Sequence, residues 1–274
     1  MANVFIEERT LTAIGNAIRA KTNTTDLILP KDMPSAMDAL SLAGADYNDG
    51  YEDGYEKGLS DIEQAKYDAF WDFYQNNGNR EEYERAFSGG GNATTLQWND
   101  TTFKPKYDLT VKGGAARMFA DCRITDLKGI LEERGLTLDL SGATGTSQIF
   151  MWSTITRLPT IDFSSAPEVH FYYAYLLKSV DKVVLKQDGS QTSYFQGCGA
   201  LEDITFEGVI GQNLGMGECK KLKRASIENI FSVLSTTATG KTATFSKTAK
   251  EAAFTTDEWE ALKATKPNWT IALA

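Results

Sequence analysis

The chain has 274 residues, of which 42% are hydrophobic, and its formal net charge is −9. That length is enough for one large domain or for two to three small ones. The negative balance argues against general binding to nucleic acid or to anionic membranes, because phosphate-rich partners would be repelled. No run of the sequence reaches the ~18 apolar residues that a membrane span needs.

Neither end of the sequence nor its cysteines indicate an oxidising compartment. The first residues, MANVFIEERT, lack the basic and apolar regions of a secretory signal, so we expect synthesis in the cytoplasm without a signal peptide. Cys122, Cys198 and Cys219 are far apart and form no CxxC pair. We therefore expect neither a disulfide framework nor a zinc site.

Residues 1–45 are predicted to form two short helices. Leu11, Ile14 and Ile18 recur at helical spacing, and Asp32 and Pro34 suit the first turn of a second helix. Helices this small bury little surface by themselves. We therefore expect this unit to dock onto another protein.

Residues 46–88 carry a different pattern. Tyrosines and glycines recur every four residues between Tyr47 and Leu59, and a short heptad follows with Lys66 as its misfit. The apolar heptad positions are Leu59, Ile62, Ala69 and Phe73. A flexible linker is the alternative, but aromatic stripes need burial. We favour a helical, coiled-coil-type segment through which copies of the chain associate.

The same stretch also contains a partial calcium-loop pattern. Asp49, Asp53 and Gly54 have the spacing of three positions in an EF-hand loop. Tyr51 and Ser60 would then stand where that loop needs an oxygen ligand and a bidentate glutamate. No calcium site is predicted, and no other metal site either.

The chain is self-similar between residues 118 and 227. The segments that begin at Leu158, Val180, Leu201 and Leu222 are separated by 22, 21 and 21 residues, and an earlier member covers 136–141. A period of this length is typical of one strand plus a turn or short helix per repeat. The units are expected to stack as a parallel ladder, with alternate residues inward. The expected inward residues are Ile161, Phe163, Val183, Leu185, Ile204 and Phe206.

A second signature precedes the strands: an aromatic residue or Met, two further residues, and then a small residue or Cys. Its instances are Phe119 to Cys122, Phe150 to Ser153, Tyr172 to Tyr175, Phe195 to Cys198 and Met216 to Cys219. We expect four of these residues to fill the second wall of the core: Phe119, Phe150, Phe195 and Met216. The cysteines are expected to pack beside them as small apolar residues.

The stretches "MFADC…LTLDLS" and "YFQGCGALEDITF" resemble the BspA-like class of bacterial leucine-rich repeats over residues 118–227. Ser153 and Tyr175 depart from the Cys position of that class. The resemblance implies an α+β fold in which helical segments precede a short, irregular leucine-rich-repeat-type solenoid at 89–235.

A helix and a cap are predicted after the repeats. Ser226 is expected to be an N-cap, and the residues Ile227, Ile230, Phe231 and Leu234 share one helical face. Residues 236–274 should then form a strand–helix–strand cap, with a strand at 241–246, a capping box of Thr255 and Glu258, a helix bearing Trp259 and Leu262, and a strand at 269–273.

The two flanks carry a further resemblance. The stretches "IGNAIRAKTNTTDLILPKDMPSAMDAL" and "GKTATFSKTAKEAAFTTDEWEALKATKPNWTIALA" resemble the ends of tail-associated proteins of phages and prophages of Gram-positive bacteria. The resemblance implies a structural protein of a virion tail or baseplate, attached by its N-terminal helices to other tail proteins. It also implies recognition of a host-surface glycan or protein, and a homo-oligomer, with a trimer favoured.

Catalytic motifs are missing from the sequence. There is no GxSxG and no GxxxxGK[ST], the single histidine, His170, has no placed partner, and acidic pairs such as Glu132-Glu133 are adjacent rather than convergent. We expect a protein that is not an enzyme and needs no cofactor. A bacterial surface adhesin and a polysaccharide-degrading tail enzyme stay open as alternatives.

Candidate ligand-binding residues lie on the outward positions of the predicted repeats. The outward strand residues include Asp162, Lys182 and Asp203, and the flanking aromatic residues are Trp152, Tyr172, Tyr173 and Tyr194. Aromatic rings with polar neighbours suit sugars or protein partners.

Overall fold

The computed structural model describes residues 57–58, 61, 64–72, 83, 85–88 and 97–274. The chain divides into two compact units, Met1–Glu63 and Gln64–Ala274. The predicted helices of residues 1–45, the tyrosine repeat and the calcium-loop pattern lie outside the described residues.

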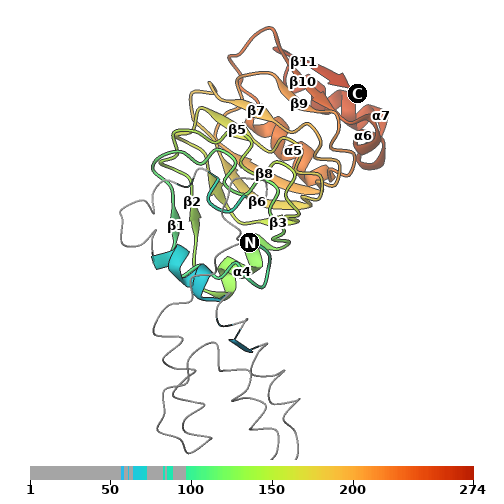
Figure 1. The fold of residues 1–274 in the computed structure, drawn as a ribbon. Coiled ribbons are helices and arrows are strands. Elements are labelled where there is room, and N and C mark those ends of the chain that lie inside the picture. Colours follow the sequence, from blue (N-terminus) through green and yellow to red (C-terminus); the bar gives the residue numbers. More distant parts are fainter. Residues whose placement is uncertain (1–56, 59–60, 62–63, 73–82, 84, 89–96) are drawn as a thin grey trace, which may run out of the picture. The chain divides into compact units, whose positions relative to one another are not determined.

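The described part combines helices with parallel sheets, which confirms the α+β class (Figure 1). All the strand pairs in this part of the chain are parallel. The smallest sheet pairs β1 (Leu109–Thr110) with β2 (Leu138–Asp139). A four-stranded sheet contains β3 (Arg157–Leu158), β4 (Ile161–Asp162), β6 (Ser179–Val184) and β8 (Asp203–Glu207).

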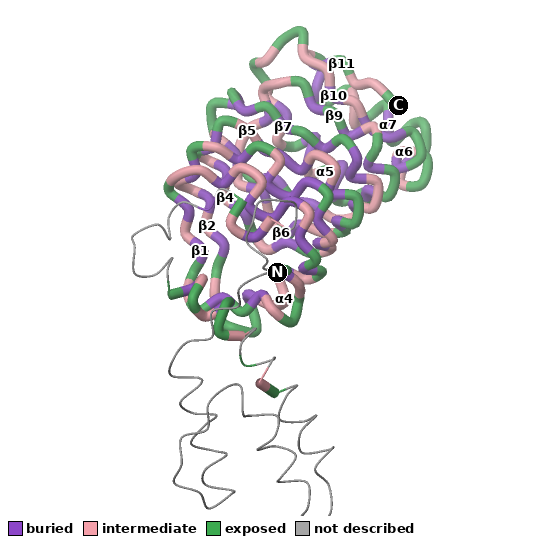
Figure 2. The backbone as a smooth tube through the Cα atoms, viewed as in Figure 1, coloured by how far each residue is buried: buried purple, intermediate pink, exposed green. Residues whose placement is uncertain are grey.

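A five-stranded sheet extends to the C-terminus. It contains β5 (Glu168–His170), β7 (Thr192–Tyr194), β9 (Leu214–Met216), β10 (Lys241–Phe245) and β11 (Trp269–Leu273). From β4 to β9 the chain alternates between the four-stranded and five-stranded sheets, and each strand from β6 onward pairs with an earlier one. Buried and less buried residues alternate along β7, β8 and β9 (Figure 2), as expected for sheets with one face inward.

The predicted strand register is confirmed in one step and wrong in the next. Leu158 lies opposite Val180, and Ile161 lies opposite Val183, as the repeat spacing predicts. Val183 lies opposite Phe206, however, and not opposite Ile204 as expected. The pairing of β6 with β8 shifts between Val180 and Val183. Since both possible partners are apolar, the sequence pattern could not distinguish the two registers.

Stacked phenylalanine rings form one wall of the core. Phe87, Phe119, Phe150, Phe171 and Phe195 follow one another with ring centroids 5.2, 5.8, 5.6 and 5.3 Å apart. All five side chains are fully buried. The stack contains the three phenylalanines predicted for this wall, Phe119, Phe150 and Phe195, and the fourth predicted residue, Met216, is buried too.

The third member of the aromatic signature was predicted one residue too late. Phe171 and Ala174 are buried, whereas Tyr175 is 50% exposed and Tyr172 is only partly buried. The instance is therefore Phe171 to Ala174 rather than Tyr172 to Tyr175. Because three aromatic residues stand in a row here, the sequence permits either Phe171 or Tyr172 as the buried one. The stack of neighbouring rings selects Phe171.

The cysteines pack as core residues. Cys122, Cys198 and Cys219 are free and buried. Burial raises the pKa of the Cys122 and Cys198 thiols to about 12, and it raises the pKa of Cys219 well above its ordinary value. The Cys198 thiol donates to the carbonyl of Phe171 at 3.0 Å. These thiols therefore lack the thiolate character that reactivity needs.

Helix α5 (Arg224–Val233) follows the last repeat strand and buries the predicted face. The predicted N-cap is wrong, because Lys223 occupies that position without a capping side chain. Ser226 is instead buried inside the helix, and its hydroxyl accepts from the backbone N–H of Ile204 at 2.9 Å. A second side chain, Asn229, accepts from the N–H of Phe206 at 2.6 Å. The helix thus takes the place of a further strand beside β8.

The C-terminal cap contains two helices between its strands rather than one. These are α6 (Lys247–Ala253) and α7 (Thr256–Ala264), between β10 and β11. The predicted capping box of Thr255 and Glu258 is confirmed, with both reciprocal bonds present. Trp259 is buried, and its ring meets those of Phe231 and Phe245 edge-on. The cap and α5 therefore share one core.

The helical residues 64–72 turn Tyr67 and Trp71 into the core, and Ala69 is exposed. The other predicted heptad positions lie outside the described residues, so a coiled coil stays a prediction. The remaining labelled helix is α4 (Leu127–Glu133), which precedes β2 in the chain. Among the residues placed by the structure, no helix is both long and apolar enough to cross a bilayer.

Candidate binding site: an exposed aromatic array

Trp152 and Tyr173 occupy equivalent places on two successive coils of the chain. Each lies two residues after a stacked phenylalanine, and each has a left-handed backbone, with φ of 57° and 56°. The equivalent residues on the neighbouring coils are Asp121 (φ 57°) and Gly197 (φ 81°). Asp and Gly adopt this conformation readily, whereas it costs roughly 1–2 kcal/mol for a residue with a bulky side chain.

Backbone hydrogen bonds between coils hold this conformation. The N–H of Asp121 donates to Met151 at 2.9 Å, that of Trp152 donates to Tyr173 at 3.1 Å, and that of Tyr173 donates to Gln196 at 2.7 Å. Gly197 is required beneath the second ring, because an added Cβ would lie 2.9 Å from the Cα of Tyr173. The coils therefore fix two neighbouring aromatic side chains in place.

The rings form a continuous array. Trp152 and Tyr173 are nearly parallel at 7°, with centroids 6.3 Å apart, and Tyr173 stacks on Tyr175 at 5.3 Å. Tyr172 lies 4.0 Å from Tyr173 at an angle of 38°. We define the aromatic array as Trp152, Tyr172, Tyr173, Tyr175 and Tyr194, together with His170, which joins them.

The array gathers most of the large apolar side chains that the described chain exposes. Trp152 and Tyr175 are each 50% exposed and Tyr194 is 39% exposed, and Leu176 lies exposed directly after Tyr175. Leu273, in β11, is the fifth and last such side chain among the described residues. Concentrations of this kind mark binding surfaces more often than scattered single residues do.

His170 connects the rings to strand β5. Its ring lies parallel to Tyr172 at 5.8 Å and meets Tyr194 edge-on at 4.6 Å. The Nδ1 atom accepts from the backbone N–H of Gln148. Burial lowers the pKa of His170 below its ordinary value, although the nearby carboxylate of Glu168 opposes the shift. The neutral form is therefore the one that fits this place.

The phenol groups supply polar tips. A hydrogen bond between the side chains of Tyr172 and Tyr173 is the main cause that raises the pKa of Tyr173. The array thus offers aromatic carbon together with hydroxyl groups, which is the combination found where ligands carry both apolar and polar edges.

The predicted charged candidates lie elsewhere, and each is bonded to a neighbouring residue outside the predicted set. The Lys182 ammonium lies 2.8 Å from Glu207, and the Lys223 ammonium lies 2.6 Å from Asp203. Asp162 accepts from the N–H of Ser164 at 2.7 Å. All three candidates, Asp162, Lys182 and Asp203, belong to the four-stranded sheet. The structure therefore brings the four predicted aromatic residues together and leaves these three apart.

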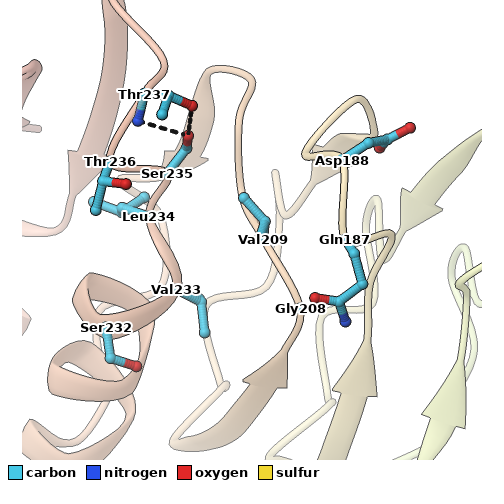
Figure 3. A pocket seen from close by; sticks show the side chains of 10 residues that line it. All are labelled: Gln187, Asp188, Gly208, Val209, Ser232, Val233, Leu234, Ser235, Thr236 and Thr237. Carbon is cyan, nitrogen blue, oxygen red and sulfur yellow. Dashed lines mark hydrogen bonds between the residues drawn. The ribbon is translucent and has the colours of Figure 1, made fainter.

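A pocket of about 280 Å³ lies at the far ends of β6 and β8 (Figure 3). It is lined by Gln187 and Asp188, by Gly208 and Val209, and by residues 232–237. Within it, the Ser235 hydroxyl is already bonded to Thr237. Asp188 is the one charged residue of the lining, so the pocket offers less recognition chemistry than the array does.

Two further members of the array were not among the predicted site residues. Tyr175 was placed at the Cys position of the repeat signature, as a departure from it, and His170 was considered only as a catalytic base. Once Phe171 is known to lie in the phenylalanine wall, the residues on either side of it can be assigned. Tyr173 and Tyr175, two and four residues after Phe171, then face outward together. No group of three or more side chains suited to a metal occurs in the part of the chain that is described.

Comparison with protein-family models, with curated proteins and with solved structures found no match to this chain.

Proposed function

We propose that the chain is a structural binding protein of a phage or prophage tail or baseplate. Its stacked coils would be leucine-rich repeats of the BspA-like type, and they would present the aromatic array to a glycan or protein of the host surface. The observation that carries the proposal is the stacked pair of the half-exposed Trp152 and the partly exposed Tyr173, both with a left-handed backbone.

The choice of two large aromatic residues at these positions favours a role in binding. Two bulky residues together cost roughly 2–4 kcal/mol in this conformation, at about 1–2 kcal/mol each. Stacking of the two rings recovers only about 0.5–1.5 kcal/mol. The same backbone also occurs at Arg85, Arg117 and Gln148, with φ of 55–56°, so the conformation belongs to the coils. What distinguishes positions 152 and 173 is a large aromatic side chain where the neighbouring coils have Asp or Gly, which would serve stability as well.

The repeat type is supported by the parallel strands and their step. Leu158 lies opposite Val180, and Ile161 opposite Val183, which is a step of 22 residues in each case. Leucine-rich repeats have periods of about 20–29 residues, with one strand per repeat on one side. The buried Cys122 and Cys198, each three residues after a stacked phenylalanine, fit the Cys position of the BspA-like pattern.

The location in a virion rests on the resemblance of the two flanks. Attachment through residues 1–45 and association through residues 46–88, with a trimer favoured, are parts of the same proposal. Mass spectrometry and antibody labelling of purified particles test the location. A protein found only on bacterial cells, and never in particles, would favour the alternative of a surface adhesin.

The binding role is tested with the full-length protein on cells of the bacterium in which its gene occurs. We expect the double variant Trp152→Asn, Tyr173→Asn to lose most of its cell binding, since Asn tolerates the backbone conformation and lacks the ring. Leu273→Ala is the matched control, because it removes an exposed apolar side chain elsewhere. Equal binding by both variants would contradict the assignment of the site.

The enzymatic alternative has its own readout. Incubation of the protein with purified cell walls would release new reducing ends if the protein were a polysaccharide-degrading enzyme. We expect none, together with retention of the protein on the walls.

A further inference from the structure

We propose that the aromatic array binds a protonated amino group carried by a saccharide chain. This inference rests on the proposed function and names the ligand class of the same site. It follows from the contrast between the charges around the array and those of the ion pairs on the four-stranded sheet and its flanks.

Most acidic side chains of the four-stranded sheet and its flanks already have a basic partner. These pairs are Asp126 with Arg157, Asp181 with Lys128, Glu207 with Lys182, Asp203 with Lys223, and both Glu228 and Glu258 with Arg224. Pairs of this type leave little net charge for a ligand.

Two acids beside the array have no such partner. No hydrogen bond or ion pair joins the Asp121 carboxylate to another residue that the structure describes. The Glu218 carboxylate accepts from the backbone N–H of Gly197 at 2.7 Å, and no Lys or Arg within the described chain pairs with it. These two carboxylates therefore keep their charge for a ligand.

Their positions bracket the stacked rings. Asp121 precedes Trp152 by one coil at the equivalent left-handed position, and its N–H bonds to Met151, the neighbour of Trp152. Tyr173 covers one face of the Trp152 ring from the following coil. The uncovered face is therefore the one on the side of Asp121.

Glu218 lies at the opposite end of the stack. It holds Gly197, which is the residue in contact with Tyr173. Its charge also contributes to the raised pKa of Tyr173, which agrees with a carboxylate close to that phenol. A carboxylate therefore flanks the rings at each end of the stack.

A cationic group matches this site in two ways. The face of an indole or phenol ring attracts a cation through its quadrupole, with Trp the strongest, and an unpartnered carboxylate adds a charge-assisted hydrogen bond to an ammonium group. A neutral hydroxyl group would gain neither the full attraction to the ring face nor the full strength of the hydrogen bond to the carboxylate. An anionic ligand would be repelled at both ends.

A saccharide fits better than a protein as the carrier. The array exposes one short row of rings with phenol tips, whereas a protein interface of ordinary size takes about 20–30 residues from each side. Sugar rings offer apolar faces to aromatic side chains and hydroxyl groups to the tips of Tyr172 and Tyr173. The ligand class is therefore a glycan with free amino groups.

The test compares two oligosaccharides of equal length, the oligomers of glucosamine and of N-acetylglucosamine, by calorimetry and by Trp fluorescence on the full-length protein. They differ chiefly in the charge of the amino group. We expect the glucosamine oligomer to bind about tenfold more tightly or better, which corresponds to about 1.4 kcal/mol. The difference should shrink as salt is raised, because exposed charges are screened.

The variants Asp121→Asn and Glu218→Gln keep the shape of each side chain and remove its charge. Gln can still accept from the N–H of Gly197. We expect each variant to weaken binding of the glucosamine oligomer severalfold and to leave the weak binding of the acetylated oligomer unchanged. Glu207→Gln, on the four-stranded sheet, is the matched control and should have no effect.

Equal affinity for the two oligomers, or equal effects of Glu218→Gln and Glu207→Gln, would overturn the inference. Tighter binding of a lysine-rich peptide than of the glucosamine oligomer would also overturn it, because the carrier would then be a protein. If the ring variants abolish cell binding while neither oligosaccharide binds, the proposed function stands and this inference falls. If the ring variants leave cell binding intact, the proposed function itself fails.

Discussion

Side chains of the phenylalanine wall should contribute much more to the free energy of unfolding than side chains of the aromatic array, although the two kinds are neighbours in the chain. Phe150 is fully buried between two other rings, whereas Trp152 is half exposed on a strained backbone. We expect Phe150→Ala to lower the free energy of unfolding by about 3–5 kcal/mol. Trp152→Asn should change it by less than about 1 kcal/mol, because relief of strain offsets the lost stacking.

Urea unfolding of the two variants measures this difference. A Trp152→Asn variant destabilised as strongly as Phe150→Ala would show that Trp152 is a core residue. Its conformation would then need no functional explanation.

His170 should make stability depend on pH in a defined direction. Its pKa in the folded state lies below the ordinary value of 6.5, because burial disfavours the charged form. Between the folded and unfolded pKa values the unfolded chain binds more protons, so stability falls as pH is lowered from about 6.5. Protonation of Nδ1 also removes the acceptor for the N–H of Gln148.

The chain has one histidine, so NMR titration of its ring gives the folded pKa without ambiguity. Chemical unfolding at several pH values gives the matching loss of stability. His170→Gln should remove the dependence near pH 6. A folded pKa at or above 6.5 would contradict the expected sign.

At the scale of elements, a buried lysine closes the end of α5. Lys266 is 7% exposed, and its ammonium donates to the carbonyl of Leu234 at 2.5 Å, just beyond the helix. Burial lowers its pKa. We expect Lys266→Met to cost about 1–3 kcal/mol, because the buried carbonyl would be left without a donor.

Thermal unfolding of this variant should be compared with that of Lys263→Met. Lys263 pairs with Glu260 near the surface of α7, and such pairs contribute only about 0–1 kcal/mol. Equal effects of the two substitutions would mean that Lys266 acts through general packing rather than through the helix end.

Elements with local signals could be predicted, and those that depend on a neighbour could not. The capping box of α7 and the apolar face of α5 follow from short spacings in the sequence, and both are present. Ser226 was expected to cap α5 because serine has that preference. It lies inside the helix instead, since its hydroxyl is used by the N–H of Ile204 on the adjacent strand.

At the scale of the whole molecule, the core of the described unit begins before the repeats. Tyr67, Trp71, Tyr83 and Phe87 are buried, and they lie in the segment predicted to associate between copies. Phe87 stacks directly on Phe119 at 5.2 Å. Each large buried aromatic side chain contributes about 1.5–3 kcal/mol, which together is a large part of an ordinary stability of about 5–15 kcal/mol.

We therefore expect a chain of residues 64–274 to unfold cooperatively on heating. A chain of residues 89–274 should melt about 10 °C lower or more, or lose its cooperative transition. Circular dichroism of the two proteins measures this. Equal melting temperatures would show that the repeats need no aromatic residues from 64–88.

The sequence by itself determined the features that repeat at short range. The 21- and 22-residue steps, the alternation of apolar residues within each strand and the small residue after each aromatic one are sufficient to predict parallel strands around a shared core. Each of these patterns can be recognised from residues of one coil, or from the residue at the equivalent position of the next coil.

Only the tertiary structure decided the choices between adjacent residues. Phe171, Tyr172 and Tyr173 are all aromatic, and the stack from Phe150 to Phe195 determines that Phe171 lies inside and the two tyrosines outside. Likewise, the outward charges of the strands were expected to be free for a ligand, but residues one coil away neutralise them. The physical reason is that both choices depend on contacts between coils, which the sequence of a single coil does not contain.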